Sequence, residues 1–365
     1  MAKAMYVGVG DKARKVKKIY VGVDSKARRA KKGYIGVGGV ARPFFSEEPG
    51  VAYYGTAPAL DEARTGLAAA SVGDYALFIG GINNSSAYTR TADAYNKNLS
   101  KGTPTSLAMA RSNMAGASVG DYAIFGGGRT GNTTFQDLFA SYDLNLLRAT
   151  SYKMSQARGF LSATSVGNYA IFAGGMSSSS AYSNVVDAFD TSLTRKTPTV
   201  LSEAKEKSGA ARVGNYAIFA GGDKGQTYLT SADAYSDNLV KTTVSALNAG
   251  WTVSGASTEN HALFTLGAST DVYDANLTKT TVQGLSKNSA MCGSASLNGY
   301  AIFAGGSQNI VDVYDKNLSR NSVTPKGSSG NNTVGVTVGD YALFGGGTIS
   351  NLSDVVDVYT ILKNQ

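Results

Sequence analysis

A four-residue phrase, Tyr-Ala-Leu/Ile-Phe, recurs at nearly regular intervals along the chain and limits the folds that the chain can adopt. It begins at Tyr75, Tyr122, Tyr169, Tyr216, His261 (as His-Ala-Leu-Phe), Tyr300 and Tyr341. Successive starts are 47, 47, 47, 45, 39 and 41 residues apart. A repeat of this period is typical of architectures in which each unit is one supersecondary element packed on its neighbours. We therefore predict seven equivalent units.

Each unit has the composition of four short β-strands. In the first unit a run of small residues at 66–73 precedes YALF and a glycine pair, and TADAY and the Thr-rich SKGTPTSL follow. Such runs, separated by Gly, Asn and Asp, are typical of strands and turns. YALF is apolar at every position, so both faces of its strand must be covered, as they are when sheets pack face to face around a ring. The small first strand fits the crowded centre of that ring. We predict an all-β, seven-bladed β-propeller.

Two further signals recur in the units and resemble those of a known family. A glycine pair such as Gly80-Gly81 follows the aromatic strand, and an Asp-x-aromatic phrase such as Asp93-Ala94-Tyr95 comes later. Together with the period, they resemble the kelch-repeat family of β-propellers over residues 51–365. The late Trp of that family is replaced here by Thr-rich strands. The glycine pairs predict places where backbones meet closely or φ is positive.

The segment before the first complete unit predicts how the ring closes. VAYYGTAPALDEAR, at 51–64, matches the end of a unit, because Leu60 and Arg64 correspond to Leu107 and Arg111. The seventh unit ends near Tyr359 and has no fourth strand other than the short ILKNQ. An open ring would expose unpaired strand edges. We predict that residues 51–60 form the outer strand of the last blade, beside the strand around 355–359.

The chain offers little material for catalysis. It contains one His, His261, and one Cys, Cys292, which cannot supply a zinc site with the usual ligands. G-x-S-x-G occurs once, as GASVG at 116–120, but this run is the small first strand of the second unit, so we expect no nucleophile elbow there. His261 stands where the other units have Tyr, so we interpret it as a packed strand residue. We expect no enzyme activity, no catalytic residue, no cofactor and no metal.

Charged residues that recur at one repeat position are interpreted as structural. They are Asp93, Asp187, Asp233, Asp312 and Asp357 in one set, and Arg64, Arg111, Arg158 and Lys205 in the other. A residue that catalyses a reaction breaks the symmetry of the repeats, whereas these preserve it. We expect the aspartates to accept hydrogen bonds from nearby backbone.

The loops between the second and third strands do break the symmetry. They are long and polar in units one to four, short in units five and six, and of medium length in unit seven. Their Tyr, Ser, Asn and Gly content is typical of adaptable recognition surfaces, although polar loops can also be merely tolerant of change. The candidate ligand-binding residues on these loops are Tyr88, Arg90, Arg129, Phe135, Tyr182 and Tyr228.

The N-terminal segment differs from the rest in charge and in repeat length. Residues 1–46 hold 12 Lys or Arg and 2 Asp, a net charge of +10, whereas the remainder holds 22 basic and 24 acidic residues. This asymmetry predicts an anchor module at 1–46 and a propeller at 47–365. A 14-residue repeat predicts a small meander of hairpins, which gain order by adding their edges to another protein or to copies of themselves. The candidate anchor residues are Tyr6, Arg14, Tyr20, Arg28, Arg29 and Tyr34.

Three functions of this basic segment stay open at this point. Its charge and aromatic residues suit nucleic acid, and it could instead be a solubilising extension. Its Tyr-Val-Gly-Val and Lys-Ala-Arg phrases resemble a module at the start of virion proteins of phages and prophages in gut Firmicutes. That resemblance implies a tail-associated virion protein whose anchor module docks to other virion or tail proteins and whose propeller binds a bacterial surface glycan or protein. The alternative is an intracellular kelch-type scaffold with a nucleic-acid-binding tail.

The same resemblance implies a location in the virion after synthesis in the host cytoplasm. No secretory signal is expected, because Gly and Lys interrupt the apolar residues near the start. No window approaches the roughly 18 apolar residues of a membrane span, so we expect no membrane insertion.

Overall fold

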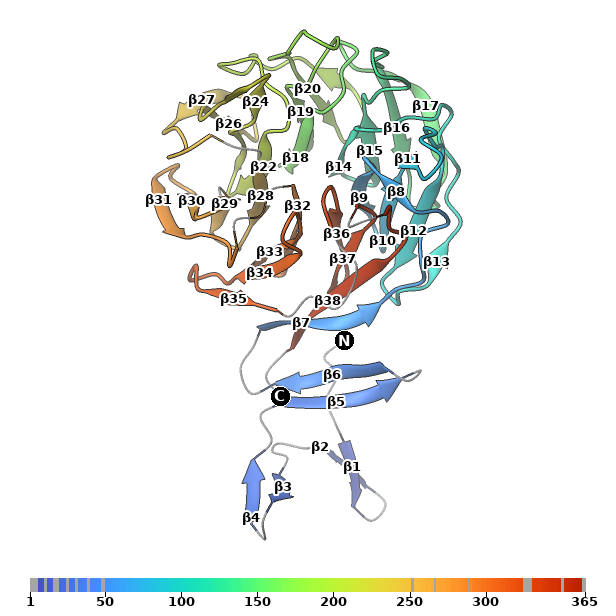
Figure 1. The fold of residues 1–365 in the computed structure, drawn as a ribbon, viewed down its shortest axis with the longest axis vertical. Helices are drawn as coiled ribbons and strands as arrows, with labels where there is room; N and C mark the ends of the chain where they lie inside the picture. Colours follow the sequence, from blue (N-terminus) through green and yellow to red (C-terminus); the bar gives the residue numbers. More distant parts are fainter. Residues whose placement is uncertain are drawn as a thin grey trace.

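The protein is a ring of antiparallel sheets with a row of small hairpins beside it (Figure 1). The computed structural model describes residues 6–9, 12–15, 20–23, 26–29, 32–37, 40–46, 50–250, 253–265, 267–287, 289, 291–323, 330–348 and 351–362. Over these residues the regular structure is all β, and no helix long and apolar enough to cross a membrane occurs. Seven four-stranded sheets surround a central axis, which confirms the predicted seven-bladed β-propeller.

The first four blades follow one another along the chain, each with its first strand innermost. Blade one consists of β9 (Ala68–Val72), β10 (Tyr75–Ile79), β12 (Ala92–Asn96) and β13 (Lys101–Gly102). Blade two consists of β14 (Ala115–Val119), β15 (Tyr122–Gly126), β16 (Leu138–Tyr142) and β17 (Arg148–Lys153). Blade three consists of β18 (Ser162–Val166), β19 (Tyr169–Ala173), β20 (Val186–Asp190) and β21 (Arg195–Lys196). Blade four consists of β22 (Gly209–Val213), β23 (Tyr216–Ala220), β26 (Ala232–Ser236) and β27 (Lys241–Val244).

The last three blades complete the ring. Blade five consists of β28 (Ser254–Ser257), β29 (His261–Thr265), β30 (Ser269–Asp274) and β31 (Lys279–Gln283). Blade six consists of β32 (Cys292–Leu297), β33 (Tyr300–Gly305), β34 (Ile310–Tyr314) and β35 (Arg320–Ser322). Blade seven consists of β36 (Val334–Val338), β37 (Tyr341–Gly345), β38 (Val356–Leu362) and β7 (Gly50–Thr56).

The core lies between the blades, because the second strand of each sheet is covered on both faces. Leu77 of β10 packs in one apolar cluster with Phe125 of blade two, while Phe78 packs in another with residues of blade seven. The side chains of Leu77 and Phe78 are both fully buried. Phe78 also meets Tyr95 of β12 edge-on, with ring centroids 5.9 Å apart. Such pairs add about 0.5–1.5 kcal/mol beyond the area that they bury.

The glycine pairs lie where backbones approach closely and φ is positive, as predicted. Gly80 and Gly81 have φ values of 66° and 114°. A Cβ on Gly80 would lie 2.5 Å from the carbonyl oxygen of Arg111, and one on Gly81 would lie 2.8 Å from that of Thr65. Only glycine fits both the positive φ and this close approach of backbone.

The outer strands are shorter than the sequence predicts in blades one and three. Strand β13 contains two residues of the predicted SKGTPTSL, and β21 also contains two. Pro104 and Pro198 follow these strands within two residues. Proline cannot donate a ladder hydrogen bond, so it ends the pairing. Blades two and four lack this proline and have outer strands of six and four residues.

The N-terminal strand closes the ring, which confirms the prediction from the half-repeat. Strand β7 pairs antiparallel with β38, from Thr56 opposite Asp357 to Gly50 opposite Leu362. The ladder is shorter than the predicted 51–60, although the backbone N–H of Leu60 still bonds Asp354 at 2.8 Å. Of the ILKNQ segment, the described residues Ile361 and Leu362 extend β38.

Three hairpins precede the closing strand. They pair β1 (Tyr6–Val9) with β2 (Lys12–Lys15), β3 (Tyr20–Val23) with β4 (Lys26–Arg29), and β5 (Lys32–Val37) with β6 (Val40–Ser46). Each is a separate two-stranded sheet rather than part of one meander. Strand β6 contacts β7 and β38, so the third hairpin lies against blade seven (Figure 1). The candidate anchor residues all lie in strands, with Tyr6 in β1, Arg14 in β2, Tyr20 in β3, Arg28 and Arg29 in β4, and Tyr34 in β5.

Candidate binding surface

A short three-membered ladder forms in five blades on the face where the glycine pairs lie. The residue after the glycines pairs on one side with the linker that enters the blade and on the other side with the returning loop. The members are Thr65, Ile82 and Tyr88 in blade one; Ser112, Arg129 and Phe135 in blade two; Gly159, Met176 and Tyr182 in blade three; Glu206, Asp223 and Tyr228 in blade four; and Asn331, Thr348 and Leu352 in blade seven. Because blade seven packs on blade one, these ladders form one continuous arc. We call the arc the loop rim.

Four of the predicted binding residues occupy the same place in the loop rim. Tyr88, Phe135, Tyr182 and Tyr228 are the loop members of their ladders, so the structure brings them to equivalent positions. The first three are half-buried, and Tyr228 is 48% exposed. Phe135 lies over Gly159 of blade three, where a Cβ would come within 3.2 Å of its ring. It therefore packs between blades as well as facing the loops.

The two predicted arginines have different surroundings. Arg90 is exposed, two residues beyond Tyr88, and does not take part in the ladder. Arg129 is the centre of its ladder, and its guanidinium carbon lies 4.8 Å from the ring centre of Phe160. A cation at this distance over an aromatic face contributes about 0.5–1 kcal/mol at an exposed site.

A ring of residues at the mouth of the central channel was not predicted. Asn113, Phe160 and Lys207 each precede an inner strand and have φ values of 53°, 57° and 50°. Their backbone N–H groups form a chain of hydrogen bonds around the mouth, from Asn113 to Gly66 (2.7 Å), from Phe160 to Asn113 (2.9 Å) and from Lys207 to Phe160 (3.0 Å). Each bond crosses from one blade to the next. The only signal in the sequence is that these residues share one repeat position.

The mouth ring and the loop rim meet in blades two to four. Phe160 lies between Arg129 and Lys207, whose Nζ is 5.2 Å from the ring centre. Lys207 also bonds Glu206 at 2.8 Å and lies 3.7 Å from Asp223. Burial raises the pKa of Glu206, the Lys207 ion pair opposes this, and Asp223 adds to it. The result is an aromatic ring flanked by charges of both signs.

The inner strands line a channel along the axis of the ring. Its wider half has a volume of about 780 Å³, and one repeat position contributes a polar side chain to its lining in every blade: Ser71, Ser118, Ser165, Arg212, Ser257, Ser296 and Thr337. The Ser118 hydroxyl donates to the carbonyl of Ser71 at 2.6 Å, and that of Ser165 donates to Ser118 at 2.5 Å. These hydroxyls therefore tie neighbouring blades together, and the charged side chains in this lining are Arg212 and Glu259.

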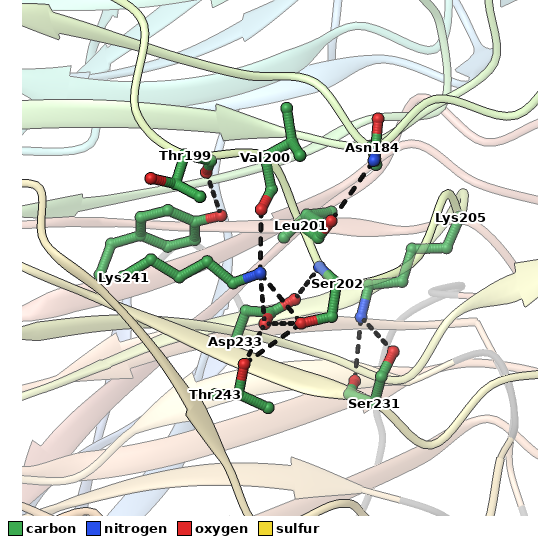
Figure 2. A network of polar contacts seen from close by, with 11 residues as sticks. Asn184, Thr199, Val200, Leu201, Ser202, Lys205, Ser231, Asp233, Lys241 and Thr243 are labelled. Atoms are coloured by element: carbon green, nitrogen blue, oxygen red, sulfur yellow. Dashed lines mark hydrogen bonds and ion pairs between the residues drawn. The ribbon is translucent and has the colours of Figure 1, made fainter.

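In blades one, three, four, five and six the recurring aspartate joins the blade to the linker that enters it. Figure 2 shows this network in blade four, where Asp233 accepts hydrogen bonds from the backbone N–H of Ser202 (2.8 Å) and its hydroxyl (2.6 Å). Lys241 lies 3.2 Å from the same carboxylate. Lys205 donates to the carbonyl of Ser231 at 2.9 Å. The aspartate thus bonds backbone and hydroxyl groups, as its symmetric recurrence indicated.

In blades one and three the linker residue is arginine, and it adds an ion pair. Nη1 of Arg158 donates to the carbonyls of Gly174 (2.7 Å) and Val185 (2.6 Å), and Nη2 meets Asp187 at 2.6 Å. Arg64 makes the equivalent contacts with Asp93. All four charged side chains are fully buried, so each charge is compensated inside the protein.

Other groups with catalytic potential are dispersed. Within the described part of the chain, no group of three or more His, Cys, Asp or Glu residues could hold a metal ion. His261 begins β29 in the position of the other tyrosines, half-buried, with Nδ1 3.4 Å from the hydroxyl of Thr258. Burial raises the pKa of Cys292 to about 11, which keeps this thiol protonated at neutral pH. The loop rim and the mouth of the channel present aromatic rings, hydroxyls and charges.

Comparison with known proteins adds no family to this description. No protein-family model matches the chain, and no curated protein matches its sequence. The protein is therefore described by its architecture, a seven-bladed β-propeller closed by an N-terminal strand.

Proposed function

We propose that the protein is a non-enzymatic binding protein of a virion, associated with its tail, and that its kelch-like propeller recognises a glycan or protein on a bacterial surface. The β-propeller fold itself suggests a protein-interaction role. The observation that carries the proposal is the loop rim. It places an aromatic residue at the same position in four consecutive blades, Tyr88, Phe135, Tyr182 and Tyr228.

The chemistry of the loop rim supports recognition of polar ligands. Tyrosine supplies a large amphipathic contact with few rotors to immobilise, and Ser and Asn supply adaptable hydrogen bonds. Tyr182 and Tyr228 lie on adjacent blades, and the polar loop SSSSAY precedes the first of them. The mixed charges around Phe160 lie beside these loops. Stacking on sugar rings and hydrogen bonding to their hydroxyls need these groups.

The N-terminal hairpins support a docking role for residues 1–46. Each described hairpin is a two-stranded sheet whose outer edges have no further strand among the described residues. Such edges can be extended by strands of a partner. We propose that this module docks to other virion proteins, in a protein that is made in the host cytoplasm.

The experiment measures binding of the labelled full chain to bacterial cells of candidate hosts. We expect Tyr88→Ala, Tyr182→Ala and Tyr228→Ala together to abolish cell binding without a large change in melting temperature. Gln308→Ala is the matched control, because Gln308 is exposed on the short loop of blade six. Unchanged cell binding by the triple variant would refute the role of the loop rim.

The charge of residues 1–46 favours a second candidate function. A net charge of +10 suits an intracellular kelch-type scaffold whose tail binds nucleic acid. Binding of this kind weakens steeply as the salt concentration rises. Duplex DNA titrated with the full chain at 50 and 200 mM salt tests it, and mass spectrometry of purified phage particles tests the first proposal. Detection of the protein in particles, with no salt-sensitive DNA binding, would exclude the scaffold.

A further inference from the structure

Blade two lacks the carboxylate around which the other interblade networks are built. In blades one, three, four, five and six an aspartate accepts the backbone N–H of the entering linker at 2.6–3.0 Å: Asp93, Asp187, Asp233, Asp271 and Asp312. In the first blade Asp93 lies opposite Phe78 in the sheet, and in blade two the residue opposite Phe125 is Ala140. The acidic side chain is therefore missing at this position, while the rest of the network is present.

The first remaining group is Arg111, which is 3% exposed. Its Nη1 donates to the carbonyls of Gly127 and Leu138, both at 2.7 Å. These are the same two bonds that hold the guanidinium of Arg158, whose Nη2 then meets Asp187. Nη2 of Arg111 is thus held toward Ala140, and it has no hydrogen-bond partner among the residues described.

The second cation is Arg148 at the start of β17. Its counterparts Lys101 and Lys241 lie 2.8 Å and 3.2 Å from the aspartates of their blades. Arg148 instead donates through Nε to the carbonyl of Ser106 at 2.7 Å, and its buried Nη1 has no partner in the described structure. Two guanidinium groups therefore border the place that a carboxylate fills elsewhere.

Neutral donors complete the site. The backbone N–H of Ala108 corresponds to that of Ser155, which donates to Asp187 at 3.0 Å, and Ala108 has no such acceptor among the described residues. The acidic neighbours of Arg64 in the linker, Asp61 and Glu62, are replaced in blade two by Ala108 and Met109. The donors of an anion site are thus present, and no acidic side chain among the described residues pairs with Arg111 or Arg148.

An uncompensated buried charge is costly, and the state of Arg111 reflects this cost. Burial lowers the pKa of Arg111 to about 10; the neighbouring Tyr142 opposes this shift and the Arg148 cation adds to it. In blade three, by contrast, Asp187 opposes the effect of burial on Arg158. An anion from solution could do for Arg111 what Asp187 does for Arg158.

We propose that blade two binds a carboxylate group from outside the fold, held by Arg111, Arg148 and the backbone N–H of Ala108 in the place of the missing aspartate. The ligand class follows from the five other blades, where an aspartate carboxylate accepts the equivalent backbone N–H, and from blades one and three, where that carboxylate also meets the equivalent arginine. Paired N–H donors of a guanidinium match the two oxygens of a carboxylate. The source of the group is either a small free acid or an acidic side chain of a partner.

Thermal unfolding of the full chain tests the site without knowledge of the natural ligand. Sodium acetate replaces sodium chloride at constant ionic strength, and a ligand that binds only the folded state raises the melting temperature. We expect a rise of a few degrees for the natural sequence. Ala140→Asp supplies the carboxylate internally, so we expect a higher melting temperature in chloride and no further rise in acetate beyond the general effect of the salt.

Two more variants keep the test decisive. Ala140→Asn has the shape of aspartate without the charge, so it should block the acetate response without the gain in chloride. Asp187→Ala creates the same vacancy in blade three, and we expect it to be destabilised in chloride and partly rescued by acetate. If it does not fold, the natural sequence and the two variants at position 140 still decide the question. An equal response to acetate in the natural sequence and Ala140→Asp would overturn the proposal.

Two further arms define the ligand. If phosphate stabilises the natural sequence more than acetate does, relative to Ala140→Asp, the site takes a tetrahedral anion and the carboxylate assignment is wrong. An acetylated, amidated peptide with one central aspartate is compared with its asparagine analogue. Stabilisation by the aspartate peptide at concentrations at least tenfold lower than acetate supports a partner side chain, and equal or weaker action supports a free acid.

Discussion

The buried network between blades and the loop rim above it use the same strands in different ways. In the network, Arg64 and Arg158 make the same bonds in two different blades. In the loop rim, the central residue of each ladder changes from Ile82 to Arg129 to Met176 along the arc. Repetition shows where the fold constrains the side chain, and variation shows where it does not. Ala140 departs from the repeated network, and this is why it points to a ligand.

The largest effect is expected from removal of β7, because this strand closes the ring that carries both the network and the loop rim. A variant that lacks residues 1–46 keeps β7, so we expect it to unfold cooperatively, with a melting temperature within a few degrees of that of the full chain. A variant that lacks residues 1–56 loses β7, which exposes the edge of β38. It also uncovers Tyr359, whose ring centre lies 5.6 Å from that of Tyr53. We expect loss of cooperative unfolding and aggregation. Calorimetry of the two truncations measures this, and equal melting temperatures would contradict the closure.

A second prediction separates the complete network from the incomplete one. Arg158→Met and Arg111→Met each remove two hydrogen bonds to carbonyl groups, but only Arg158→Met leaves a buried carboxylate, Asp187, without its cation. We expect Arg158→Met to lower the free energy of unfolding by about 3–5 kcal/mol. Arg111→Met should cost at least about 2 kcal/mol less, because no charge is left behind. Urea unfolding in chloride at pH 7 compares them, and equal costs would mean that Arg111 has an anionic partner already.

The seven blades and the closing strand could be predicted because the number and the register of the repeats can be read from the sequence. The period of the YALF phrase gives the number of units, and the match of Leu60 with Leu107 places the extra strand in register. The early end of β13 could have been predicted as well, since Pro104 cannot continue a ladder. These features depend on short-range chemistry that the sequence displays directly.

The sites were harder to predict because they depend on where distant residues meet. Phe160 and Lys207 adopt positive φ, which the sequence does not signal for such side chains. The missing aspartate at Ala140 was visible, since only six of seven units carry the Asp-x-aromatic phrase. The two arginines around this position could not be predicted, because Arg111 and Arg148 come from separate segments that only the folded sheet brings to Ala140.

The pH dependence of stability tests the buried cation of blade four, Lys205. Burial lowers the pKa of Lys205 to about 8, while its unfolded value is about 10.5. Between these values the unfolded chain binds more protons, so stability rises with pH from about 8 to 10.5, by up to about 3 kcal/mol. In Lys205→Met this rise should be absent. Urea unfolding across the range measures the difference between the two proteins, which share every other titrating group, and parallel curves would contradict the buried, destabilised ammonium.

The smallest effect is expected in the loop rim, where tyrosines face the loops rather than the core. Tyr228→Ala removes a side chain that is 48% exposed, so we expect a change of about 0.5 kcal/mol in the free energy of unfolding. Tyr235, in the same blade, is fully buried and donates to the carbonyl of Thr199 at 2.8 Å, so Tyr235→Ala is the reference for a structural tyrosine. Chemical denaturation of the pair shows whether one residue type has two roles. A loss of unfolding free energy in Tyr228→Ala as large as that in Tyr235→Ala would mean that the loop-rim tyrosine is structural. The variation of the loop rim between blades would then need an explanation from packing rather than from binding.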